Sequence, residues 1–419
     1  MTPDTASAPG AGNRSRWIII TLLFLGTVVN YLDRLAIPQL APTLKSEFSL
    51  SNSQYASINS WFLIIYASSM FLWGAVFDRV GNRAGFSIAV VVWSLAQIGH
   101  AFSRSFASLC AMRAMLGLGE GGHWPGVTRT IAAWFPARQR AFAIGIANTG
   151  ASLGPALAPP LIFWIQFSFG WKMVFIATGV LGFVWLAAWL LAYPKTKKPS
   201  ADPGVPAVNA VREHRPVAWR ILLKRREVWG IILGRFFGDP IWWLYLNWMP
   251  LYLFEARGFS LKEIAAFGWM PFVAAGVGAL SGGACSGFLL RSGWEVMRAR
   301  KTTIAIGTVF LMAGFGTAFA TSPYVALALI CMTMFGFQFW VGNVQTLPSD
   351  LFPVGAVGSI AGFSGTAAGL GAVLLNQSTG WVVDHFSYTP ILIISAVLAP
   401  TATSVLFFLT RRAVPIKNN

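Results

Sequence analysis

The sequence predicts an all-α membrane protein with twelve transmembrane helices in two pseudo-symmetric six-helix bundles. Only 11% of its 419 residues are charged, whereas soluble globular proteins carry about 25%. Nearly uncharged stretches such as Val174–Leu191 and Ile391–Leu409 reach the length of about 18 residues that a helix needs to cross the hydrocarbon core. Such runs recur along the chain, which indicates a bundle of spanning helices.

The spans follow from the apolar runs in chain order. Residues Met1–Asn13 are polar, and the run from Trp17 continues without a small-residue cleavage site. This run therefore indicates a first spanning helix and not a removed signal peptide. We predict spans at 17–37, 54–74, 84–103, 106–127, 140–164, 171–193, 227–254, 262–290, 302–321, 323–347, 355–383 and 388–410.

One long polar connector, rich in Pro, Lys and Arg, divides the chain into halves of six spans. The halves echo each other weakly, since Trp134–Pro136 and Leu351–Pro353 both lie between the fourth and fifth span of their half. We predict an N-terminal tail at 1–16, a first bundle at 17–193, a linker at 194–226, a second bundle at 227–410 and a C-terminal tail at 411–419.

The basic residues orient these spans. Most of the 31 Lys and Arg residues lie in the tails, the linker and alternate loops, while the opposite loops hold Lys45, Arg104, Lys172, Arg257 and Lys262. Cytoplasmic loops carry the excess of basic residues, so both chain ends are expected in the cytoplasm, with the bundle in the cell inner membrane. Topology accounts for the net charge of +17, and nucleic-acid binding is not expected.

Soluble-enzyme motifs are absent from the sequence. It has no phosphate-binding Gly-x4-Gly-Lys-Ser/Thr loop, no His-Glu-x-x-His segment and no paired cysteines, and its four histidines are scattered. Cys110, Cys285 and Cys331 fall in apolar segments and are expected to be core residues. We therefore expect no enzyme activity, no cofactor and no metal, and we expect a monomer.

Six charged residues lie inside the predicted spans, more than two residues from either end, where charge is costly and usually lines a cavity or pathway. Arg34 offers a planar fork that matches a carboxylate, and Glu120 is a carboxylic acid that can carry a proton. Asp33 is either a second proton site or the counter-ion of Arg34. Arg113 and Glu120 lie two turns apart on one helix face, and the alternative interpretation is that they form a structural ion pair. For Arg235 and Asp239 the structural interpretation is favoured.

Aromatic and amide side chains in the spans are candidates for sugar binding. Aromatic rings can stack on a sugar face, and amides within the bilayer need hydrogen-bond partners. Packing is the alternative for each of them, and His123 could instead tune a proton site. The candidates are Tyr31, Tyr66, His123, Trp124, Asn148, Trp242, Trp243, Tyr245, Asn247, Asn343, Gln345 and Asn376.

Several segments of the sequence show a family resemblance, at two levels. Gly74–Arg83 resembles the loop between the second and third helices of the major facilitator superfamily, whose fold has two six-helix halves. The resemblance implies that Asp78, Arg79 and Arg83 act in gating. Five further segments resemble the anion:cation symporter family, and the last two look closest to its hexuronate branch. They are Asn30–Arg34, Gly119–Pro125, Trp134–Pro136, Asp239–Trp243 followed by Tyr245, and Gln345–Asp350.

The resemblance implies proton symport of a sugar acid such as galacturonate or glucuronate. In relatives the arginine matching Arg34 grips the substrate carboxylate, and the acids matching Asp33 and Glu120 take part in proton coupling. Positions matching Tyr31, Tyr66 and Arg113 lie at or near the pocket. His123 departs from the small residue or Asn expected there, and Ser286–Arg291, the equivalent loop of the second half, lacks the acid of the first.

Other functions remain open at this level. The same fold could import galactonate, glucarate or another organic anion, or act as a metabolite or drug antiporter, although Arg34 disfavours a cationic drug. A membrane receptor would need an output domain, and a membrane enzyme would need a nucleophile or metal cluster. The sequence shows neither an output domain nor such a nucleophile or metal cluster.

Overall fold

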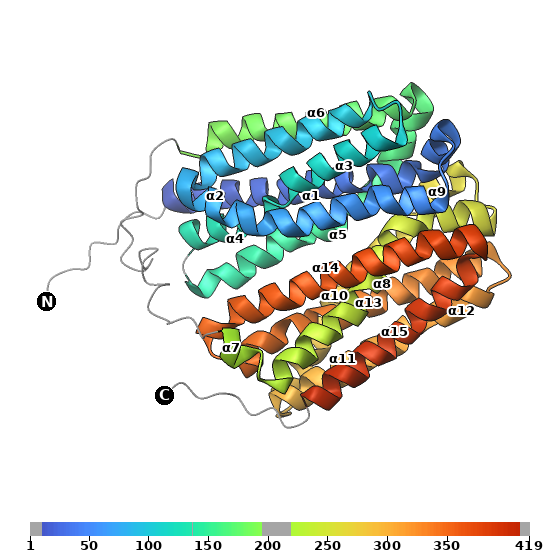
Figure 1. Cartoon of the computed structure of the whole chain (residues 1–419). Coiled ribbons are helices and arrows are strands. Elements are labelled where there is room, and N and C mark those ends of the chain that lie inside the picture. The colour runs from blue at the N-terminus through green and yellow to red at the C-terminus, as the bar shows by residue number, and fades with distance from the viewer. Residues whose placement is uncertain (1–10, 136, 195–218, 411–419) are drawn as a thin grey trace, which may run out of the picture.

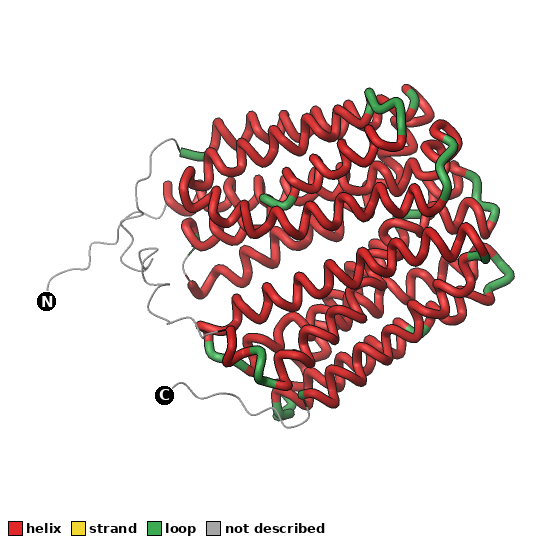
Figure 2. Tube along the Cα trace, in the orientation of Figure 1, coloured by secondary structure: helices red, strands yellow, loops and turns green. Residues whose placement is uncertain are grey.

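The computed structural model describes residues 11–135, 137–194 and 219–410. Within these ranges all regular structure is helical (Figure 2). The elements are labelled in Figure 1. They are α1 Ala11–Phe48, α2 Asn52–His100, α3 Phe106–Glu120, α4 His123–Trp134, α5 Ala137–Phe169, α6 Trp171–Ala192, α7 Trp219–Leu222, α8 Arg226–Arg257, α9 Leu261–Phe267, α10 Met270–Arg291, α11 Val296–Leu311, α12 Ala313–Phe319, α13 Pro323–Leu351, α14 Val354–His385 and α15 Tyr388–Leu409.

The helices coincide with the predicted spans, with a few breaks and one merger. Helix α2 covers the second and third predicted spans, and the chain turns inside it at Gly81, whose φ of 78° suits a residue without Cβ. Three other predicted spans are each divided between two helices, namely α3 with α4, α9 with α10 and α11 with α12. Seven helices of the described chain are long and apolar enough to span a membrane, or eight if the bent α2 stretch counts as one.

Two groups of helices lie side by side (Figure 1). In the first half, α1 packs on α5 and α6, and α2 packs on α3 and α6; in the second, α8 packs on α14 and α15, and α13 packs on α10 and α11. The halves meet where α2 contacts α14, α1 contacts α8, and α5 contacts α9 and α10. The contact between α1 and α8 brings Arg34 of α1 to 5.8 Å from the Trp243 ring of α8.

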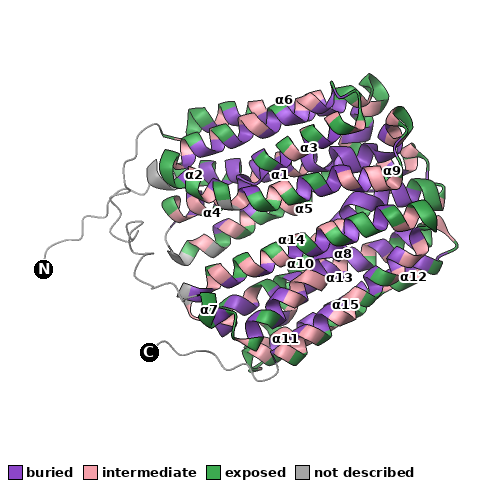
Figure 3. Cartoon of the chain, in the orientation of Figure 1, coloured by how far each residue is buried: buried purple, intermediate pink, exposed green. Residues whose placement is uncertain are grey.

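The outer surface of the bundle is apolar. Large hydrophobic side chains point outward, including Leu191 at 89%, Leu280 at 75% and Val309 at 70% exposure. Asp33, Arg34 and many other polar residues are buried inside (Figure 3). This arrangement inverts the pattern of a water-soluble protein and is what a lipid surrounding requires.

Both ends of the described chain lie at the same end of the bundle, on the left in Figure 1. We call this the proximal end. The opposite, distal end is formed by the turns between α1 and α2, between α8 and α9, and between α14 and α15.

Candidate functional site

Arg34 on α1 lies at the centre of the candidate site and is only 2% exposed. Its Nε and Nη2 donate to the same oxygen of Glu120, Oε2, at 3.0 and 2.8 Å, and Nη2 also donates to Oδ1 of Asn30 at 3.1 Å. The partner of Arg34 is therefore Glu120 on α3, and the interpretation of Asp33 as its counter-ion is wrong. Neighbouring residues on a helix point in different directions, so Asp33 faces away from Arg34.

Aromatic rings from both halves surround the Arg34 guanidinium. Its Cζ lies 4.7 Å from the ring centre of Tyr31, 4.8 Å from that of Tyr66 and 5.3 Å from that of Phe62. Trp243 of α8 approaches to 5.8 Å from the other half. At these cation–π distances the four rings form an aromatic cage that stabilises the Arg34 guanidinium at the seam between the halves.

Arg113 lies behind Arg34 in the first half and is 1% exposed. Its Nη2 donates to the backbone oxygen of Arg34 at 3.0 Å and to Oδ1 of Asn59 at 3.3 Å, while Nε and Nη1 have no partner among the described residues. Two helical turns separate Arg113 from Glu120 by about 10 Å along α3. The alternative of an ion pair between them is wrong, because Glu120 pairs with Arg34.

Asp33 is fully buried between α1, α2 and α6. Neither carboxylate oxygen has a hydrogen-bond partner in the described chain. Gln97 donates to the Asp33 backbone oxygen at 3.3 Å and to Oγ1 of Thr178 at 2.8 Å. An unpaired buried carboxylate is costly as an anion.

His123 also lies inside the first half. Its Nε2 is 2.9 Å from Oγ1 of Thr27, and the Trp124 ring lies 5.5 Å from its own. The chain breaks between α3 and α4 at Gly121, where an added Cβ would lie 2.0 Å from Oγ of Ser69. The close approach requires glycine at position 121, and because α3 ends at Glu120 and α4 begins at His123, His123 does not continue the same helical face.

Three other candidates lie at the seam toward the distal end. Asn376 on α14 donates to the backbone oxygen of Ala56 at 2.7 Å and to Oγ of Ser60 at 2.8 Å, and it accepts from Nε1 of Trp248. The backbone oxygen of Asn247 accepts from Tyr55 at 2.5 Å. Trp243 completes the set. These residues join the halves. Trp248 belongs to the aromatic–polar cluster that the sequence indicates on the seventh span, whereas Tyr55 is a functional candidate that sequence reasoning missed.

The remaining candidates are dispersed. Asn343 is buried in the second half, where Nδ2 donates to Gly282 and Phe339 and Oδ1 accepts from Arg300. The Tyr245 hydroxyl is buried without a partner among the described residues, and Trp242 stacks on Phe337. Asn148 and Gln345 are exposed. These positions are not brought together with Arg34.

Arg235 and Asp239 form an ion pair at 2.7 Å one turn apart on α8. Arg235 also donates to Oγ of Ser364 on α14 at 3.2 Å. Both contacts lie within the second half, as the structural interpretation expects.

The predicted gating residues lie near the proximal end. Asp78 pairs with Arg129 of α4, a partner that the sequence did not indicate. Arg83 donates to the backbone oxygens of Leu190 at 2.7 Å and Tyr193 at 3.1 Å, which ties the end of α6. Arg79 is exposed.

The second half replaces the missing loop acid with a different set of contacts. Arg300 of α11 pairs with Asp350 of α13 at 2.9 Å and donates to Oγ of Ser286 at 2.8 Å. The segment Ser286–Arg291, expected from the sequence to be a loop, forms the last part of helix α10. It lacks an acid, and the carboxylate comes from α13.

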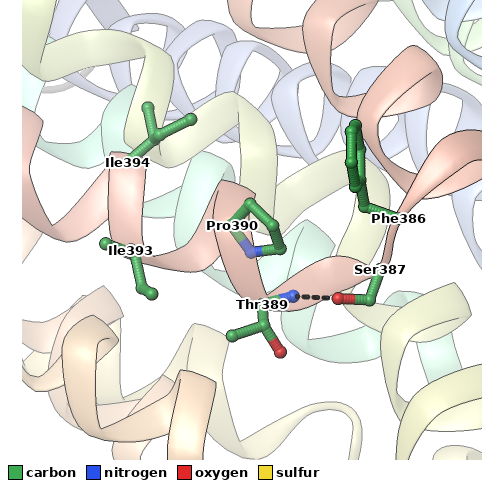
Figure 4. A pocket seen from close by; sticks show the side chains of 6 residues that line it. All are labelled: Phe386, Ser387, Thr389, Pro390, Ile393 and Ile394. Carbon is green, nitrogen blue, oxygen red and sulfur yellow. Dashed lines mark hydrogen bonds between the residues drawn. The ribbon is translucent and has the colours of Figure 1, made fainter.

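A surface hollow at the turn between α14 and α15 lies apart from this site (Figure 4). Its lining is mostly apolar, with Phe386, Pro390, Ile393 and Ile394. Thr389 donates its backbone N–H to Oγ of Ser387 at 3.3 Å, which caps α15. The hollow belongs to the distal surface and adds nothing to the Arg34 site.

A lipid-facing helical bundle with a buried ion pair at the seam of two halves defines a membrane transporter. The family model of the Major Facilitator Superfamily matches residues 23–376. The chain belongs to the major facilitator superfamily.

Named relatives and a solved structure agree with this assignment. The chain is 33% identical to the hexuronate transporter of Escherichia coli K12 over 392 residues, 91% of each chain. It is 36% identical to the galacturonate transporter of Dickeya chrysanthemi over 75% of this chain and 94% of the relative. A bacterial homolog of the human lysosomal transporter Spinster, in an inward-facing and occupied conformation, has the same fold with a TM-score of 0.74, 18% identity and coverage of 97% and 98%.

Proposed function

We propose that this chain imports a hexuronate such as galacturonate or glucuronate together with protons. The observation that carries the proposal is Arg34, a buried guanidinium at the seam of the halves that is held by one carboxylate and caged by aromatic rings. The relatives named as hexuronate and galacturonate transporters, at 33 and 36% identity, support this substrate class.

Proton coupling follows from competition for Arg34. Glu120, which accepts both bonds through Oε2, and a substrate carboxylate would compete for the same guanidinium fork. A proton on Glu120 removes the charge that holds Arg34 and frees the fork for the substrate anion. Asp33, buried without a partner in the described chain, is a second place where the proton could reside. A proton and the substrate anion therefore bind together, and the bound pair carries no net charge through the bundle.

The aromatic cage supplies the remaining recognition. The rings of Tyr31, Tyr66 and Trp243 offer flat faces to the apolar side of a sugar, and the two phenols offer hydroxyl groups. A pyranose with one carboxylate matches one guanidinium flanked by rings better than a dicarboxylate does, because Arg113 is already turned to backbone and amide oxygens.

Orientation and assembly are part of the same proposal. The bundles 17–193 and 227–410 act as the two moving halves, and the chain acts as a monomer in the inner membrane. The proximal end faces the cytoplasm, as the basic residues there favour. Residues 1–10, 195–218 and 411–419 of the tails and linker lie outside the described residues.

Uptake by proteoliposomes tests the proposal. Labelled galacturonate should accumulate faster with an inward proton gradient than without one. Unlabelled glucuronate should compete strongly, while galactonate and glucarate should compete weakly. Gradient-insensitive uptake would remove the coupling, and preferential competition by galactonate or glucarate would favour the transporters with those substrates, which are 29% and 28% identical to this chain.

A further inference from the structure

We propose that Asp384 and Glu255 form the outer gate of the transporter, by which the second half grips the first half at the distal end. The inference rests on the proposed function only in that transport requires the distal end to open and close. The residues predicted for gating from the sequence lie near the proximal end, so this would be a separate gate.

Asp384, at the end of α14, caps a helix of the other half. Its Oδ1 accepts the Asn52 backbone N–H at 2.8 Å, and its Oδ2 accepts the Ser53 backbone N–H at 2.8 Å and the Ser53 hydroxyl at 2.5 Å. Asn52 and Ser53 are the first residues of α2, whose N–H groups have no partner within the helix. The carboxylate also meets the positive end of the α2 dipole.

Glu255, at the end of α8, makes the second contact. Its Oε1 accepts from Nζ of Lys45 at 2.6 Å, and its Oε2 accepts from the Tyr388 hydroxyl at 2.7 Å. Lys45 also donates to Oδ1 of Asn52 at 2.5 Å. One carboxylate thus joins the end of α1 and the start of α2 to α8 and α15.

Glycine allows α14 to come close enough for these contacts. A Cβ added at Gly380, one turn before Asp384, would lie 2.6 Å from Cβ of Ala56 and 2.7 Å from the backbone oxygen of Asn52. At Gly380 the two helices meet backbone to backbone, and the side-chain contacts between α14 and α2 on either side of it are hydrogen bonds from Asn376 and to Asp384.

Solvent access separates this contact from the buried Arg34 site. Asp384 is exposed, and the Glu255 and Lys45 side chains are 31% and 14% exposed. When the halves part, water can replace each partner, so the contacts favour the closed state without making it permanent. Deeper along the same seam, Asn376 reaches the buried Ser60, which opening would expose.

The labelling rate of a cysteine at Ser60 measures distal opening. The variant Ser60→Cys is made with Cys110, Cys285 and Cys331 replaced, and the purified protein is treated with a polar maleimide. Asp384→Ala should raise the labelling rate roughly fivefold, the usual effect of losing a helix cap. Glu255→Gln should raise it in the same direction.

Glu263→Ala is the matched control. Glu263 caps its own helix at the distal end, accepting the Ser260 backbone N–H and hydroxyl at 2.8 Å each. It makes this contact within the second half, so its loss should leave the labelling rate unchanged. An equal rise in both variants, or no rise in Asp384→Ala, would overturn the gate.

A milder variant covers the case in which Asp384→Ala fails to fold. Ser53→Ala removes only the hydroxyl bond to Asp384 and should raise the rate about twofold, and an unchanged rate would then overturn the proposal. The assay contains no substrate. A negative result would therefore remove the gate and leave the hexuronate proposal standing, and failed hexuronate uptake would leave the gate standing.

Discussion

At the scale of single residues, the proposed transport depends on one guanidinium shared between a protein acid and a substrate acid. Arg34 is held by Glu120 and Asn30 and covered by three rings of the first half. A buried pair of this kind adds little net stability, but removal of one partner strands the other, at a cost of about 3–5 kcal/mol. This asymmetry allows binding and folding to be separated experimentally.

Arg34→Ala should abolish the thermal shift produced by galacturonate and should lower the melting temperature of the free protein, because Glu120 is left unpaired. The double variant Arg34→Ala/Glu120→Gln should recover the melting temperature without recovering binding. Recovery of the ligand shift by the double variant would show that the anion binds elsewhere.

Glu120→Gln alone should retain galacturonate binding, since Arg34 keeps its charge and loses its competitor. Accumulation driven by a proton gradient should fall to the level of passive exchange. Binding is measured by thermal shift and accumulation by proteoliposome uptake. Full accumulation by this variant would assign the coupled proton to Asp33.

At the scale of elements, close helix packing positions the charged residues. Helix α3 carries both Arg113 and Glu120 and lies against α2 through Gly117, where an added Cβ would lie 2.7 Å from the Phe62 backbone oxygen. The glycine therefore sets the distance between α3 and the Arg34 cage, to which Phe62 belongs.

Gly117→Ala should destabilise the protein by about 1–3 kcal/mol, the usual cost of overpacking. Gly283→Ala on α10 is the control, because nothing lies within 4 Å of its added Cβ, and alanine there should be neutral or stabilising. Thermal unfolding of the two variants gives the comparison, and equal stability would contradict the packing argument.

At the scale of the whole molecule, the two halves contact each other through two chemically different kinds of interaction. Near the middle, Arg34 meets Trp243 across the seam, and toward the distal end hydrogen bonds such as those of Asn376 and Asp384 cross between the halves. Alternating access requires these distal contacts to break while each half stays intact.

Orientation can be tested with two exposed positions in a cysteine-free background. Lys262→Cys lies at the distal end and Ser292→Cys at the proximal end. In intact cells an impermeant thiol reagent should modify the cysteine at position 262, and the cysteine at 292 should react only after permeabilisation. The reverse pattern would invert the proposed topology.

The sequence by itself determined the helices and the family. Apolar run length and charge distribution act locally along the chain, so the spans agree with the helices except at the bend of α2 at Gly81 and in the three spans that are divided between two helices. The charged candidates Arg34 and Glu120 were also evident, because charge is rare in a bilayer and stands out in an apolar run.

Only the tertiary structure decided which partners these side chains have. Glu120 lies 86 residues from Arg34, and Asp384 lies 332 residues from Asn52, so no local pattern joins them. Helix rotation and packing select the partner, which is why Arg34 pairs with Glu120 and not with the adjacent Asp33. Packing also places Asn343 and Tyr245 in the interior of the second half, away from Arg34. The sequence does not show which face of a helix a neighbouring helix covers, so it could not indicate this.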